Sequence, residues 1–291
     1  MLWVPITIGA AALQVARNAV QRGLIEAAGP WGAALVRFLF GLPFALIFAI
    51  AAVLGFGTRL YDFSPRFFIA CAIGGAAQVA AMAGILVSMR RSGFATATAF
   101  QQSSVPLSAL FGLAIGDGLD ALRWVGIGLT TLGLAVLAWP RREIGEGWSG
   151  AFLGLAAGAG FALSANAYRV AALALSPGHP FAAAPICLLV VQTMQSAALT
   201  AILAFAGRGS LLAIFRAWRT SLAAGLFGAA GSGLWFMAVG LFPVGPVRAV
   251  GVVDVPIAAL AGHRLFSEWM GTRRALAAAS TVVGVVLAAI G

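Results

Sequence analysis

Apolar runs of about 20 residues follow one another along the whole chain, separated by short stretches rich in charge, Gly, Pro or Trp. A helical run of that length matches the hydrocarbon core of a bilayer, whereas the strands of an outer-membrane barrel would alternate over about 10 residues. The pattern therefore predicts an all-α membrane protein with ten transmembrane helices. The expected spans are residues 2–21, 32–54, 67–88, 94–115, 122–139, 149–170, 181–205, 219–241, 247–266 and 273–290.

Polar side chains interrupt the first span on one side only. Gln14, Arg17, Asn18 and Gln21 fall within an arc of about 100° on a helix. The stripe either lines a wet cavity or belongs to a helix end from which Arg17 reaches the interface. Gln14 lies deeper, so we expect it to face a cavity or to make an interhelical hydrogen bond.

Other spans also carry polar groups, which are costly inside a bilayer and usually face a cavity or a partner. Spans five and ten hold little beyond Thr and Ser, so we expect them at the periphery, where they could form a homodimer or scaffold face. The other eight should surround a polar centre. The residues expected to face a substrate are Gln14, Asn18, Arg37, Gln78, Gln101, Asn166, Tyr168, Gln192, Trp235 and Asp254.

Several of these residues have a second interpretation. Arg37 lies near a span end and could reach lipid headgroups, and Trp235 could pack in a core rather than line a cavity. Asp254 is the one acid well inside a span, two residues before Pro256. It could titrate with substrate and couple transport to protons, or form a structural ion pair with an Arg.

The chain repeats itself at an offset of 150 residues. "SVPLSALFGLAIGD" (104–117) falls on "DVPIAALAGHRLFS" (254–267), and Thr131 falls on Thr281. At an offset of 148, Asn18 falls on Asn166. The sequence thus predicts two five-span repeats, 1–145 and 146–291. An odd number of spans inverts the second copy, as in many transporters whose site lies at the repeat interface.

Composition agrees with this class. Hydrophobic residues make up 62% of the chain and charged residues 9%, and the mean hydropathy is +1.01. A soluble protein would carry about a quarter charged residues. The net charge of +10 comes from arginines at the ends of apolar runs, which is typical of membrane flanks and not of a nucleic-acid surface. Cys71 and Cys187 lie inside apolar runs without metal-ligand spacing, so we expect small buried side chains, and no cofactor or metal.

Ten spans in two such halves resemble the EamA-type exporters of the drug/metabolite transporter superfamily. The pieces that carry the resemblance are "AGPWGAALVRFLFG" (28–41) with Arg37 and residues 249–289 with Glu268; Gly118 departs from the pattern at the first-half place of Glu268. The resemblance implies a multi-pass protein of the bacterial inner membrane that transports a small molecule, and leaves the substrate open.

Guanidinium groups, one carboxylate and several amides suit a small polar or zwitterionic metabolite such as an amino acid. We therefore expect a secondary transporter, an exporter or exchanger, that works by alternating access, with lipid and substrate as its partners. The alternatives are a multidrug or cation exporter of the same fold and, less favoured, an intramembrane hydrolase using Ser232 and His263. The orientation stays open, because the Arg distribution places both termini outside the cytoplasm and the family resemblance places them inside.

Overall fold

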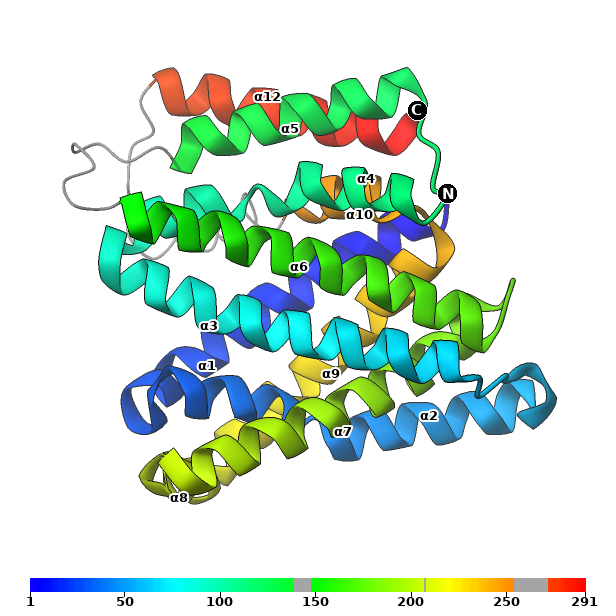
Figure 1. Ribbon diagram of the computed structural model, residues 1–291, viewed down its shortest axis with the longest axis vertical. Helices are drawn as coiled ribbons and strands as arrows, with labels where there is room; N and C mark the ends of the chain where they lie inside the picture. Colours follow the sequence, from blue (N-terminus) through cyan, green and yellow to red (C-terminus); the bar gives the residue numbers. More distant parts are fainter. Residues whose placement is uncertain (139–147, 207, 254–271) are drawn as a thin grey trace. The chain divides into compact units, whose positions relative to one another are not determined.

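The computed structural model describes residues 1–138, 148–206, 208–253 and 272–291. In these ranges the chain forms α-helices, one 3₁₀ turn at Thr58–Leu60 and no strand (Figure 1). The helices are α1 (Trp3–Leu39), α2 (Leu42–Phe56), α3 (Pro65–Gln101), α4 (Ser104–Ala114), α5 (Ala121–Ala138), α6 (Trp148–Leu175), α7 (Pro180–Ala206), α8 (Arg208–Arg216), α9 (Trp218–Leu241), α10 (Val244–Gly251) and α12 (Thr272–Ile290).

Five helical stretches of the described chain are long and apolar enough to cross a membrane. Shorter apolar helices lie at Ser104–Ala114, Ala121–Leu137 and Leu276–Ile290. This composition is consistent with a helical membrane protein, as the sequence pattern predicts. The five longer stretches are Glu26–Phe56, Pro65–Ser92, Ser149–Leu175, Pro180–Phe205 and Trp218–Leu241.

The helix bounds agree with the expected spans in the second half better than in the first. Helices α5, α6, α7, α9 and α12 each begin one residue before an expected span. Helix α1 instead continues to Leu39, with a kink at Gly29, whose φ of 69° is left-handed. The second expected span is interrupted at Phe40–Gly41, because Pro43 has no N–H for the Leu39 carbonyl.

The chain packs as two compact units that do not coincide with the two halves of the sequence. Unit 1 comprises Met1 and residues 76–167 and 242–291, and unit 2 comprises residues 2–75 and 168–241. Each unit takes helices from both halves of the chain. Each polar side chain described below is therefore assigned to one unit or the other.

In unit 2, α9 approaches the junction of α1 and α2 closely enough for backbones to touch. A Cβ on Gly225 would overlap the Phe40 carbonyl oxygen and lie 2.8 Å from the Gly41 nitrogen. A Cβ on Gly228, one turn later, would lie 3.3 Å from the Arg37 oxygen. Small residues permit this approach between membrane helices, and it fixes the position of Arg37 against α9.

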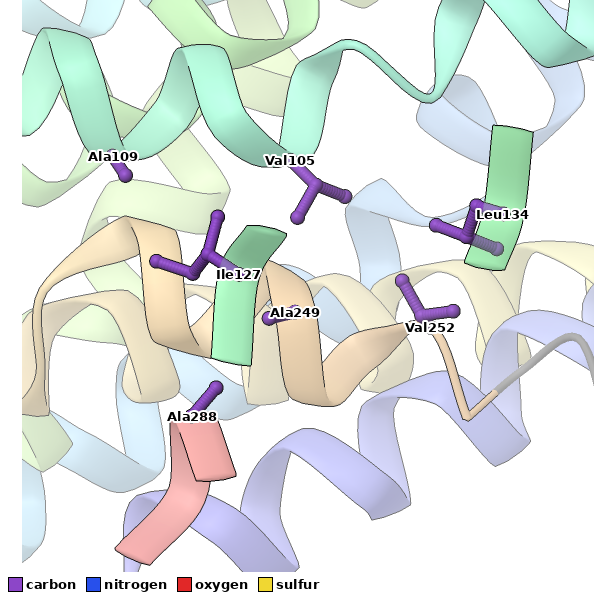
Figure 2. Close-up of a cluster of buried hydrophobic side chains, with 7 residues drawn as sticks. All are labelled: Val105, Ala109, Ile127, Leu134, Ala249, Val252 and Ala288. Atoms are coloured by element: carbon purple, nitrogen blue, oxygen red, sulfur yellow. The ribbon is translucent and has the colours of Figure 1, made fainter. Parts of the chain in front are cut away.

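In unit 1, α5 and α12 pack in the same manner. A Cβ on Gly126 would overlap the Ala288 nitrogen and lie 2.8 Å from the Gly284 oxygen, and one on Gly284 would lie 2.7 Å from the Gly126 oxygen. Next to this seam is an apolar core to which α4, α5, α10 and α12 all contribute (Figure 2). Its members are Val105, Ala109, Ile127, Leu134, Ala249, Val252 and Ala288.

Two helix ends in unit 1 share a local geometry. Between α3 and α4, the Ser103 N–H donates to the Phe100 oxygen (3.1 Å), three residues back, and Val105 donates to Gln102 (3.1 Å). After α10, the Val253 N–H likewise donates to the Val250 oxygen (3.2 Å). In the first case the cause is Pro106, which has no N–H to offer the Gln102 carbonyl.

Two glycines of α5 separate the effect of the seam from that of helix propensity. Gly126→Ala should lower the free energy of unfolding by about 1–3 kcal/mol, because the methyl group would overlap backbone atoms of α12. Gly128, two residues later, has no atom within 4 Å of its Cβ position, so Gly128→Ala should be neutral or stabilising by up to about 1 kcal/mol. Thermal melting in detergent compares the two variants, and equal effects would contradict the seam.

Candidate functional site

A row of buried polar side chains runs along α7 in unit 2. Gln192, Ser196 and Thr200 are four residues apart and therefore share one face of the helix. Gln192 and Ser196 are 1% and 3% exposed. Within the described chain, neither amide atom of Gln192 nor either hydroxyl oxygen has a hydrogen-bond partner. Unsatisfied buried groups cost about 1–3 kcal/mol each and require an explanation.

Gln195, on the flank of the same face, shows the opposite situation. Its Nε2 donates to the Gly75 oxygen of α3 (3.3 Å) and to the Tyr168 hydroxyl of α6 (3.4 Å). The Tyr168 ring stacks on Phe236 of α9, with 4.4 Å between ring centroids. Gln195 thus holds three elements of unit 2 together, whereas Gln192 holds none through its amide.

Arg37 lies in the same unit, near the end of α1. Its guanidinium lies over the Phe38 ring, 4.6 Å from the centroid, and its Nε is buried without a hydrogen-bond partner in the described chain. The one ion pair among the described residues joins Arg123 and Asp120 in unit 1, so none of the described carboxylates pairs with Arg37.

Gly41 connects Arg37 with the polar row. A Cβ at Gly41 would lie 3.1 and 3.2 Å from Nε2 and Oε1 of Gln192, and 2.5 Å from the Arg37 oxygen. The amide therefore lies against the break between α1 and α2. We use the name α7 site for Gln192, Ser196 and Thr200 of α7 together with Arg37 and Tyr168, which belong to the same unit.

The polar stripe of the first span is largely engaged in local bonds. Asn18 is exposed, and its Oδ1 accepts hydrogen bonds from Nε (3.3 Å) and Nη2 (2.8 Å) of Arg17. Gln21 donates to the Ala33 oxygen (2.9 Å). Gln14 is half-buried on α1, near Gly231 of α9. Of this stripe, Gln14 remains the residue that fits the expectation of a buried polar position.

A second polar cluster lies in unit 1, around Asn166 of α6. Asn166 is 3% exposed, and its Nδ2 donates to the oxygens of Ser108 (3.1 Å) and Ala162 (2.9 Å). Its Oδ1 is buried without a hydrogen-bond partner and lies 3.6 Å from the Cβ position of Gly112. Asn166 and Asn18, which the repeat equates, therefore differ in burial.

The remaining expected site residues are distributed over both units. Gln78 and Gln101 are half-buried in unit 1, and Trp235 is half-buried on α9 in unit 2. Asp254 and His263 lie outside the described residues. Ser196 and Thr200 are not among the residues that the sequence predicts for the site, although their spacing of four and eight residues from Gln192 could have indicated them.

The described chain also contains two cysteines and one histidine, whose side chains can bind metals. It holds no group of three or more His, Cys, Asp or Glu residues placed to bind a metal ion. Cys71 and Cys187 are free and fully buried, as expected for small apolar side chains. His179 is exposed in a turn, with its Nδ1 3.2 Å from the Pro177 oxygen.

Comparison with known proteins gives a likeness of fold. No family model and no curated protein matches the sequence. One solved structure, described only as "Crystal structure of protein", aligns with a TM-score of 0.66 over 98% of this chain and 96% of the other, at 19% sequence identity. The fold therefore occurs in a crystallised protein, and this likeness carries no activity or substrate.

The two buried glutamines of α7 provide a matched test of the site. Gln195→Leu should lower the free energy of unfolding by about 1–3 kcal/mol, because Tyr168 and Gly75 lose a donor. Gln192→Leu should be neutral or stabilising, because an apolar side chain of similar size replaces two unsatisfied atoms. Unfolding in detergent, followed by Trp fluorescence, measures both. Equal destabilisation would mean that Gln192 has a structural role.

Proposed function

We propose that this protein is a secondary transporter of a small polar or zwitterionic metabolite, built as ten spans in two inverted halves and similar to the EamA-type exporters. The observation that carries the proposal is the row Gln192, Ser196 and Thr200 on α7, whose buried polar atoms have no hydrogen-bond partner among the described residues. A protein that only needed to be stable would replace these groups by apolar ones. A site that exchanges bonds with a passing solute requires them.

The helix ends of unit 1 support the inverted repeat. The turn at Ser103 and the turn at Val253 are 150 residues apart, which is the offset that aligns Pro106 with Pro256. Helix ends at equivalent places in both halves are typical of transporters built from inverted repeats, in which discontinuous helices lie close to the substrate and ion sites.

The seam between α5 and α12 supports the same symmetry. Gly126 meets Gly284 and Ala288, and Gly133 meets Ala277 and Thr281, so the helices run antiparallel. In this antiparallel pairing, Thr131 lies at about the level of Thr281. Thr281 is also the residue that corresponds to Thr131 in the 150-residue repeat. A two-fold axis between the helices requires such self-equivalent contacts. We infer that the axis of the inverted repeat passes through this seam.

In the proposed mechanism, alternating access combines a fixed helix pair with two helix breaks that can move. The α5–α12 seam is held by backbone contact and serves as a fixed element. The breaks at Phe40–Gly41 and Gln102–Ser103 allow the adjoining helix segments to change direction, so that the α7 site opens to one side of the membrane at a time. We place the protein in the bacterial inner membrane, with the substrate and lipid as its partners.

Exchange of solutes by the purified protein in liposomes tests the proposal. We expect counterflow of at least one member of a metabolite panel. Pro106→Ala restores the N–H that can bond the Gln102 carbonyl and should slow exchange several-fold while the protein remains folded. Pro65→Ala, at the first position of α3 where Pro is tolerated, is the control and should exchange normally. Absence of counterflow for every solute under any gradient would refute the transport function.

A further inference from the structure

The α7 site suggests the chemical class of the substrate. We propose that it binds a carboxylate group, with Arg37 as the charged partner and Gln192, Ser196 and Thr200 as hydrogen-bond donors. This inference rests on the proposed transport function and concerns the same site. It selects organic acids and amino acids over cationic drugs.

The first argument concerns charge. Arg37 lies in a stretch apolar enough to span a membrane, and none of the described carboxylates pairs with it. A cation in such a position requires a counter-charge, since an uncompensated buried charge is costly.

The second argument concerns hydrogen bonds. A carboxylate only accepts hydrogen bonds, and a guanidinium only donates them, in a fork that matches the two carboxylate oxygens. The amide nitrogen of Gln192 and the hydroxyl groups of Ser196 and Thr200 add donors that no described residue occupies. The Gln192 oxygen is the one acceptor without donor ability, and it suits the ammonium group of an amino acid.

The third argument concerns length. Four helical residues rise about 6 Å, so the row from Gln192 to Thr200 extends about 12 Å along α7. A single carboxylate is much shorter than this row. The substrate can therefore place its carboxylate at one part of the row and a second polar group at another.

Matched compounds test the carboxylate directly. For alanine, leucine and phenylalanine, the panel contains the amino acid, the deaminated acid, the decarboxylated amine and the amino acid amide. Ligand-induced shifts of the melting temperature of the purified protein, and inhibition of exchange in liposomes, report binding. We expect compounds with a carboxylate to bind and the matched amines and amides to bind at least about tenfold more weakly.

Variants assign the effect to this site. Arg37→Gln should weaken carboxylate binding about tenfold or more, and Arg37→Lys, which keeps the charge without the fork, should weaken it less. Gln192→Glu, of nearly unchanged shape, should lose the acids and gain the amines. Arg66→Gln, at an exposed arginine of the same unit, should bind as the wild-type protein does. Gel filtration verifies that each variant is folded.

Three results would overturn the inference: equal binding of amines or amides, failure of every carboxylate to bind, or unchanged carboxylate binding by folded Arg37→Gln. Exchange of a solute that has no carboxylate would also overturn it and leave the transport function intact. Loss of exchange for all solutes would instead refute transport itself. The two proposals therefore fail in distinguishable ways.

Discussion

Polar groups in the apolar helices of this protein have little access to water, so each of them needs a hydrogen-bond partner within the protein. Several described hydroxyl groups solve the problem locally, by donating to a carbonyl four residues earlier: Thr7 to Trp3, Ser108 to Ser104, and Thr130 to Gly126. Longer polar side chains need partners on other helices, as Gln195 and Asn166 have. Gln192 differs from both groups, because neither atom of its buried amide has a partner in the described chain.

Close helix contacts are the second consequence of the same environment. Between helices that lipid solvates as well as protein does, association depends on packing more than on the hydrophobic effect. Gly225 against Phe40 in unit 2, and Gly126 against Ala288 in unit 1, bring backbones into contact. At these contacts the backbones of the two helices leave no room for one helix to slide along the other. In the proposed transporter, movement takes place where helices are already broken, at Phe40–Gly41 and at Gln102–Ser103.

The sequence alone predicts much of this fold and less of the site. Apolar runs place the starts of α5, α7 and α9 to within one residue, because bilayer thickness fixes their length. The pattern ends the first helix at residue 21, whereas the helical backbone continues to the break at Gly29, because polar residues are taken as a loop. It cannot separate Gln192 from Gln195, which share a type and a helix face. The partners of Gln195 lie 120 and 27 residues away, and only the fold brings them together.

Symmetry and asymmetry then have different roles in the proposed transporter. The repeat preserves features of the backbone: the turns at Ser103 and Val253, the two prolines that follow, and Thr131 opposite Thr281. It does not preserve polar side chains, because Asn18 is exposed where Asn166 is buried, and at an offset of 150 Arg37 corresponds to Cys187. Equivalent backbones allow two inverted conformations of similar energy. A substrate with distinct ends needs an asymmetric site, and the divergence of Arg37 and Gln192 from their equivalents provides it.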